Sequence, residues 1–240
     1  MAAFDTEYID TVVVGGGQAG LSVGHHLAAH GVDFVILDAN PRIGDAWRNR
    51  WDSLRVFTPA KFSGLDGMPY PAHPDYFPTK DEYADYLEAY AHRFDLPVRL
   101  GVEVDRLTRR GDHYVVAAGD EMIEVNNVVV AMAHYQVPKV PAFAAELDPS
   151  IFQIHSRDYR NPSQLHPGDA LVVGAGNSGV EIALDIHDGR RVWLAGDYPG
   201  HIPFAIDSFL ARKLLVRLVL RGLFHRLLSE RTPIGRRFRD

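Results

Sequence analysis

The first forty residues show a regular succession of apolar and polar positions. The run 11–14 is apolar apart from its threonine, and the run 33–38 is apolar between two aspartates, so each predicts a β-strand. Between these runs, apolar residues recur at helical spacing over 21–30, and Gly31 follows where a helix would end. The pattern therefore predicts a strand, a helix and a second strand.

The same succession recurs near residue 170. Strands are predicted over 170–173 and 191–195, with a helix over 180–186 between them. Strands that alternate with helices are typical of parallel sheets. We therefore expect an α/β fold that contains two such units.

The stretch 40–80 is rich in proline, glycine and aromatic residues and shows no clear period. A stretch of this length usually has a functional role. Its tryptophans and arginines suit contact with a planar ligand, and the alternative is a covering loop whose tryptophans fill gaps in the core. At its end, Thr79 predicts the N-cap of a helix. The core-facing side of that helix is expected to carry Tyr83, Tyr86, Leu87, Tyr90 and Phe94.

Residues 98–130 alternate and turn like a small antiparallel group of strands. Gly111 and Gly119, each followed by aspartate, mark the expected hairpin turns. The run 128–131 has the composition of a buried strand. A small antiparallel β element is therefore expected beside the first unit.

Prolines punctuate residues 133–150, where we place a boundary between an expected first domain, 1–135, and a second domain, 150–240. The second domain is expected to end in a basic amphipathic helix over 209–228, although the chain has a net charge of −6. We expect this helix to pack on the protein itself or on the second subunit of a homo-oligomer, and peripheral contact with a membrane is the alternative. Scattered basic residues without a recognised motif do not favour nucleic acid.

Composition narrows the chemistry. The chain has no cysteine, which excludes disulfides, thiolate metal sites and a Cys-x-x-Cys redox pair. Its 12 histidines are scattered, and we assign no metal site and no catalytic residue. No uncharged apolar run is long enough to span a membrane, and the acidic N-terminus does not resemble a signal peptide. A cytoplasmic location is therefore expected.

A glycine-rich turn follows the first predicted strand. Gly15, Gly17 and Gly20 form a G-x-G-x-x-G fingerprint between a strand and a helix. In such a turn the first glycine bends the chain, the second lets a pyrophosphate approach the backbone, and the third lets the helix pack closely. Asp38 ends the next strand, 23 residues after Gly15, where an acid can accept hydrogen bonds from a ribose. This unit is predicted to bind a dinucleotide.

The fingerprint recurs after the run 170–173. Its members are Gly174, Gly176, Asn177, Ser178 and Gly179. Asp197 again falls 23 residues after the first glycine. An acid there suits a free 2′-hydroxyl and repels a 2′-phosphate, which favours NADH over NADPH and leaves both open. Two Rossmann-like dinucleotide-binding units in one chain usually bind a flavin and a nicotinamide.

Further motifs accompany the two fingerprints. They are Gly44-x-x-Trp47, Leu54-Arg55, Phe77-Pro78-Thr79-Lys80, Tyr86-Leu87-x-x-Tyr90-Ala91 and His155-Ser156-x-x-Tyr159. Together the motifs cover nearly the whole chain, which resembles the flavin-containing monooxygenase family, the class B flavoprotein monooxygenases. The resemblance is to bacterial relatives of the plant indole-3-pyruvate monooxygenases. Family members continue past the point that matches Asp240, so the flavin domain is expected to be incomplete without a C-terminal return.

The resemblance implies FAD on the first fingerprint and NADPH on the second, with the nicotinamide unit inserted into the flavin unit. It further implies that the reduced coenzyme reduces the flavin. By the same resemblance, a flavin C4a-(hydro)peroxide is expected to form with O2 and to insert one oxygen atom into a small organic substrate. Outside the glycines and the two aspartates, the residues implied to contact the cofactors are Gln18, Ala19, Gly44, Trp47, Arg48, Arg55, Val104, Ala131, His155, Ser156 and Tyr159.

Two other functions stay open on the sequence. An NAD(P)H oxidase or diaphorase would keep both cofactors and release peroxide instead of an oxygenated product. A non-catalytic, truncated dinucleotide-binding fragment would bind one dinucleotide poorly. Product analysis separates the first alternative from a monooxygenase, and thermal shifts with FAD, NADH and NADPH test the second.

Overall fold

The computed structural model describes residues 7–133 and 136–197 of the chain. We call these the first segment and the second segment. The chain divides into two compact units, Met1–Gly196 and Asp197–Asp240, and the predicted basic helix over 209–228 lies outside the described residues. The predicted domain bounds, 1–135 and 150–240, stay a prediction.

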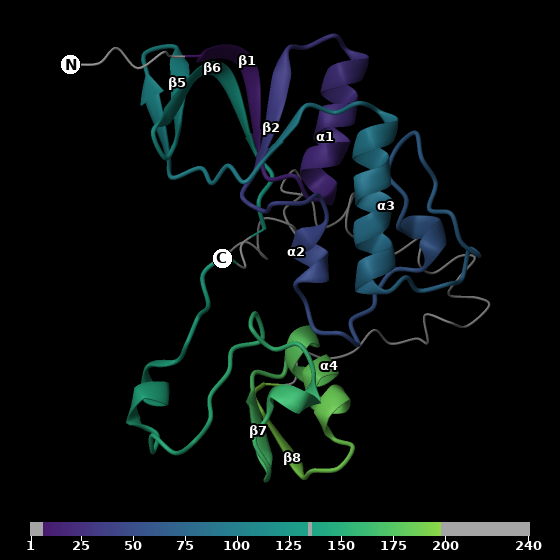
Figure 1. Ribbon diagram of the computed structural model, residues 1–240, viewed down its shortest axis with the longest axis vertical. Helices are drawn as coiled ribbons and strands as arrows, with labels where there is room; N and C mark the ends of the chain where they lie inside the picture. The colour runs from purple at the N-terminus through teal and green to yellow at the C-terminus, as the bar shows by residue number, and fades with distance from the viewer. Residues whose placement is uncertain (1–6, 134–135, 198–240) are drawn as a thin grey trace, which may run out of the picture. The chain divides into compact units, whose positions relative to one another are not determined.

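The first segment is built on one six-stranded sheet (Figure 1). In spatial order the strands are β3 (Val98–Leu100), β2 (Phe34–Asp38), β1 (Glu7–Val14), β6 (Glu121–Val130), β5 (His113–Ala118) and β4 (Arg106–Arg110). The first four run parallel, whereas β5 and β4 continue the sheet antiparallel. The carboxyl ends of β1 and β2 therefore meet at one edge, which is where ligands bind in open α/β sheets.

Two helices cover one face of this sheet. Helix α1 (Gln18–Ala29) connects β1 to β2, and α3 (Lys80–Arg93) lies beside it (Figure 1). Because side chains alternate along a strand, Val13 faces the core under these helices, whereas its neighbour Val12 belongs to a second core on the other face. The helical core also contains Leu21 of α1, which is fully buried.

The start of α3 confirms the predicted cap. The Thr79 side chain accepts a hydrogen bond from the Glu82 amide, and the Glu82 carboxylate accepts one from the Thr79 amide at 2.9 Å. This reciprocal pair satisfies two backbone donors that the helix would otherwise leave open. The predicted aromatic side is also confirmed as core. Its buried members are Tyr83, Tyr86, Leu87 and Tyr90, and Phe94 is partly buried.

The predicted hairpin turns are confirmed, since β4, β5 and β6 are joined at Gly111 (φ 59°) and Gly119 (φ 58°). Two expectations from this region are wrong. Residues 98–100 form β3, which pairs in parallel with β2 instead of joining the antiparallel group. Val130 belongs to the expected buried strand over 128–131 and is 63% exposed at the end of β6. Pairing and burial depend on tertiary neighbours, which composition does not report.

The second segment contains a smaller parallel unit. Strands β7 (Ala170–Val173) and β8 (Val192–Ala195) pair in parallel and are joined by α4 (Asn177–Ile186). On the face away from α4, Leu171, Val173 and Trp193 are more than half exposed. The remaining elements are α2 (Asp45–Arg48) and three short 3-10 helices, η1 (Ala60–Phe62), η2 (Ala142–Glu146) and η3 (Pro162–Gln164). The predicted α/β class with two strand–helix–strand units is confirmed.

Candidate functional site

The first glycine turn lies at the carboxyl end of β1. Gly15 has φ 106°, a conformation that L side chains rarely adopt. A Cβ atom on Gly20 would lie 1.8 Å from the Gly15 carbonyl oxygen. The first glycine is therefore required for the bend and the third for the close approach of α1 to the turn.

Gly17 has a different role in the same turn. It is the N-cap of α1, and a Cβ atom there would meet no described heavy atom within 4 Å. No side chain caps α1, and its first turn carries no acidic residue. Exposed Gln18 and Ala19 begin the helix. Open space in front of a helix N-terminus with free amides suits a phosphate group.

Asp38 projects from the end of β2 toward this turn. Its Oδ2 atom accepts a hydrogen bond from the Gly16 amide at 2.6 Å, and its Oδ1 atom accepts bonds from the backbone and side-chain nitrogens of Asn40, each at 2.8 Å. A carboxylate has about four acceptor positions, so Oδ2 can still accept from a hydroxyl group. Asn40 was missed in the sequence analysis, although an Asn two residues after a strand-end Asp is a signal for such a turn.

Two further predicted contacts lie at different places on the sheet. The Ala131 amide donates to the Val14 carbonyl at 2.8 Å, and a Cβ atom on Gly15 would lie 3.0 Å from the Ala131 carbonyl carbon. Ala131 is therefore part of the wall of the glycine turn. Val104 packs instead against the core that contains Leu37, on the sheet face away from α1.

Gly44 and Trp47 bring the start of the irregular stretch to this site. Gly44 has φ 89° and is so close to α3 that a Cβ atom would lie 2.7 Å from the Ala84 carbonyl oxygen. The Trp47 indole Nε1 donates to the Gln18 side chain at 3.2 Å, and its ring packs edge-on to Tyr83 with centroids 4.9 Å apart. Trp47 therefore lies beside the first residue of α1.

The two predicted arginines are bound to protein groups. The Arg48 guanidinium is 15% exposed and makes ion pairs with Asp85 at 2.6 Å and Glu88 at 3.1 Å. Burial lowers the pKa of Arg48, but its hydrogen bonds to acidic residues outweigh this effect and raise that pKa overall. Arg55 donates to the Phe77 carbonyl at 2.9 Å. In this structure Arg48 therefore fixes α2 on α3, and Arg55 fixes the strand-like stretch before α3.

The second glycine turn repeats the stereochemistry of the first. Gly174 has φ 109°, and a Cβ atom on Gly179 would lie 1.8 Å from the Gly174 carbonyl oxygen. Gly176 is the N-cap of α4, and a Cβ atom there would again meet nothing described within 4 Å. Asn177 and Ser178 are exposed at the start of the helix. Both turns therefore present an open helix N-terminus.

The end of β8 corrects the expected equivalence of the two aspartates. The Gly15 amide donates to Leu37, 22 residues later, whereas the Gly174 amide donates to Ala195, 21 residues later. The residue after the acceptor is Asp38 in the first unit and Gly196 in the second. A Cβ atom on Gly196 would lie 2.7 Å from the Ala175 amide nitrogen, just as Asp38 meets the Gly16 amide. Asp197 comes one residue too late, because the second unit is one residue shorter here.

The predicted His-Ser-x-x-Tyr motif separates into different environments. Tyr159 is 2% exposed, and its hydroxyl donates to Asp185 of α4 at 2.5 Å. Burial and this bond raise the pKa of Tyr159. His155 and Ser156 are partly exposed, and the His155 Nδ1 atom accepts from the Arg157 amide at 3.1 Å. Tyr159 therefore has a packing role, which leaves His155 and Ser156 as the accessible members.

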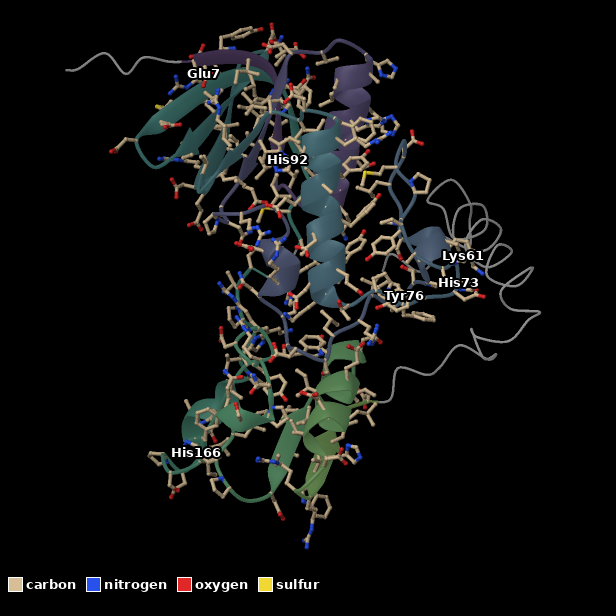
Figure 2. All side chains as sticks on the ribbon, turned by 45° about the vertical axis from the view of Figure 1, so that its right-hand side comes forward. Glu7, Lys61, His73, Tyr76, His92 and His166 are labelled. Carbon is tan, nitrogen blue, oxygen red and sulfur yellow. The ribbon has the colours of Figure 1, made fainter. Side chains whose placement is uncertain are left out.

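Within the described residues, no group of three histidine or acidic side chains could hold a metal ion. Figure 2 shows His73 beside Lys61 and Tyr76, whereas His92 lies on α3 and His166 in the second segment. In the same residues, no helix is both long and apolar enough to cross a membrane. The arrangement is suited to binding two phosphate-containing ligands at helix N-termini.

Comparisons with known proteins agree with this geometry. Residues 12–197 match the family model for pyridine nucleotide-disulphide oxidoreductases. The chain is 45% identical to an uncharacterized oxidoreductase CzcO-like from Geobacillus kaustophilus over 187 residues, which are 78% of this chain and 54% of that protein. It is 30% identical to indole-3-pyruvate monooxygenase YUCCA1 from Oryza sativa subsp. japonica, over 94% of this chain and 60% of that protein.

Comparison with solved structures also finds a flavin-dependent relative. A flavin-containing monooxygenase from Stenotrophomonas maltophilia superposes with a TM-score of 0.77 and 31% identity, over 85% of this chain and 62% of that chain. The chain spans about half the length of the curated relatives it matches, 54% of the Geobacillus protein for example. The range matched by the family model, 12–197, covers both glycine turns and every described helix and strand except the first five residues of β1. The chain therefore belongs to the pyridine nucleotide-disulphide oxidoreductase family, among homologues that are flavin-dependent monooxygenases and oxidoreductases.

Proposed function

We propose that the chain carries the FAD-binding and nicotinamide-binding units of a flavin-dependent monooxygenase. The reaction would insert one oxygen atom from O2 into a small organic substrate. One observation carries the proposal: both glycine turns have the same three-part stereochemistry, with a left-handed first glycine, an open second glycine and a third glycine against the carbonyl of the first. The names of the rice and Stenotrophomonas relatives support the monooxygenase assignment.

The first turn fits FAD. The free amides at the start of α1 would bind the pyrophosphate, and Gly17 leaves room for it. The remaining acceptor position of Asp38 would bind an adenosine ribose hydroxyl, with Asn40 holding the carboxylate. Trp47 would lie beside the same ligand through its bond to Gln18. Bound FAD would supply the electron transfer and the activation of O2.

The second turn fits a nicotinamide coenzyme, with its pyrophosphate at the start of α4. Equal spacing from the first glycine aligns Asp197 with Asp38, which favours NADH. The position of Asp38 is instead taken by Gly196, which has no side chain to accept from a 2′-hydroxyl or to repel a 2′-phosphate. We therefore propose NAD(P)H without the preference for NADH.

The contribution of the described residues is binding and orientation. They would hold the two ligands at the glycine turns, and the flavin would supply the reactive group when it is bound. Tyr83, which packs on Trp47, stays neutral in this role. Burial raises the pKa of Tyr83 to about 12. Around neutral pH this side chain therefore contributes packing and not charge.

The test is an absorption spectrum of the purified chain after incubation with FAD and gel filtration. Retained flavin bands, bleached by NADH or NADPH under anaerobic conditions, would support the proposal. Absence of flavin would contradict it and favour a non-catalytic fragment. Retained flavin that reduces one O2 to hydrogen peroxide for every NAD(P)H oxidised, with every candidate sulfide, amine and ketone substrate, would favour an oxidase.

A further inference from the structure

Trp51 belongs to the first segment but completes the core of the second. It follows α2 closely in the chain, is 5% exposed, and packs with Tyr159, Ile182 and Ile186. Its indole Nε1 is buried without a hydrogen-bond partner in the described part of the chain. Trp51 therefore contributes apolar surface to the second segment and no specific polar contact.

The next residue, Asp52, makes polar contacts to the same place. Its amide donates to the Arg160 carbonyl at 2.7 Å, and its Oδ2 atom accepts from the Asn161 side chain at 2.8 Å. The oxygen of the same Asn161 side-chain amide accepts from the Ser163 backbone amide at 3.2 Å, which orients the group at the start of η3. Apolar packing by Trp51 is non-directional, whereas these bonds fix one register between the segments.

The same stretch of chain also reaches the first glycine turn. Trp47 contacts Gln18 at the start of α1, and Trp51 follows only four residues later. On the other side, Trp51 packs on Ile182 of α4, the helix that begins at the second glycine turn. A short, continuous set of contacts therefore joins the two turns.

We propose that Trp51 and Asp52 are positioning residues that hold the second glycine turn in register with the first. The inference rests on the proposed function, because its consequence is for hydride transfer between two bound dinucleotides. With both dinucleotides bound, a hydride, which carries two electrons, would pass from the reduced nicotinamide to the oxidised flavin, so that the first would be oxidised and the second reduced. Transfer of this kind requires close alignment of donor and acceptor, so a small displacement slows it.

The test changes the polar pair and then restores it. Asn161→Asp places two carboxylates opposite one another and removes the donor. The double variant Asp52→Asn with Asn161→Asp restores one hydrogen bond with donor and acceptor exchanged, and either residue type can cap η3. Asp188→Asn, at a side chain that is 93% exposed, is the control for a change of charge in the second segment.

Anaerobic rapid mixing with NAD(P)H measures the rate constant of flavin bleaching at saturating coenzyme, separately from the coenzyme Kd. Because the Asp52 side chain is 60% exposed, we expect Asn161→Asp to lower this rate constant by about threefold to fivefold. The double variant should recover most of the loss, and Asp188→Asn should show none. An unchanged rate constant in Asn161→Asp, or a loss that the double variant does not recover, would overturn the proposal.

Amide hydrogen exchange of the protein without coenzymes gives a readout that does not depend on activity. We expect faster exchange in residues 159–165 and in α4 of Asn161→Asp, normal exchange in α1, and recovery in the double variant. If the parent chain bound no flavin, the proposed function would fail. This exchange pattern would still test whether Asp52 and Asn161 hold the second segment on the first. Unchanged exchange in Asn161→Asp would overturn the positioning role of Asp52.

Discussion

Gly20→Ala adds one methyl group at the tightest point of the first glycine turn. The new Cβ atom would lie 1.8 Å from the Gly15 carbonyl oxygen, and Cβ contacts under 3.0 Å are essentially never observed. The obstructing atom belongs to the backbone and cannot rotate away. The start of α1 and the turn must therefore separate by more than 1 Å. This movement also displaces the free backbone amides at the start of α1, which follow Gly17.

The size of the effect follows from the bonds that this movement breaks. Hydrogen bonds to charged groups contribute about 1.5–3 kcal/mol each, and their geometry does not tolerate a shift of this size. Each 1.4 kcal/mol corresponds to about a factor of ten in affinity. Losing one bond between an amide and the FAD pyrophosphate should therefore raise the Kd of FAD by about tenfold to one-hundredfold.

The second turn offers the matched variant. A Cβ atom on Gly179 also meets a carbonyl oxygen, that of Gly174, at 1.8 Å. We expect Gly20→Ala to lose FAD affinity in a flavin fluorescence titration, whereas Gly179→Ala keeps FAD and loses bleaching by NAD(P)H. Circular dichroism of both variants checks that the fold is kept. A parental Kd for FAD in Gly20→Ala, or equal loss of both ligands in both folded variants, would refute the stereochemical reasoning.

Three further predictions concern single side chains. In the same titration, Asp38→Ala should raise the Kd of FAD by about tenfold, and Asp38→Asn should raise it by less. An equal Kd in both variants and the parent would contradict a ribose contact. A hydrogen bond from Arg42 lowers the pKa of Glu88 below 4.5 in the fold, so the stability it adds is present above pH 4.5 and is lost as the pH falls through the folded-state pKa. Glu88→Gln should therefore lower Tm at neutral pH and flatten its acid dependence, and an unchanged Tm profile would count against this ion pair. Because Gly196 takes the position of Asp38, Asp197→Asn should change the ratio of kcat/KM for NADH and NADPH by less than about tenfold, and a larger shift toward NADPH would restore Asp197 as the specificity residue.

The parts of the fold that were predicted correctly depend on local signals. Apolar periodicity located both strand–helix–strand units, and glycines located the turns between their elements. Thr79 is recognisable as a cap from its residue type directly before a helical pattern, and its partner Glu82 lies within the same turn of helix. These features need no knowledge of the rest of the chain, and the sequence contains each of them in full.

The β3 error and the alternatives that the sequence leaves open come from features that depend on distant residues. The three residues of β3 have no pattern that distinguishes pairing with β2 from pairing with β4, and β2 lies about sixty positions earlier in the sequence. Trp51 seemed suited to a planar ligand or to a gap in the core, and the structure places it in the core of the second segment. Arg48 stays a predicted flavin contact, and its acidic partners on α3 lie 37 and 40 positions later in the sequence, beyond the reach of a local pattern.

Asp197 shows why equal spacing is weaker evidence than equal register. Both aspartates lie 23 residues after a fingerprint glycine, but spacing along the chain adds up a helix and a loop whose lengths differ between the units. The α1 helix has 12 residues and α4 has 10. The hydrogen bond from the first glycine to the neighbouring strand is a direct spatial reference, and it moves the equivalent position to Gly196. Glycine fingerprints therefore identify a dinucleotide site from sequence, whereas the residue that selects the coenzyme has to be assigned from the strand register.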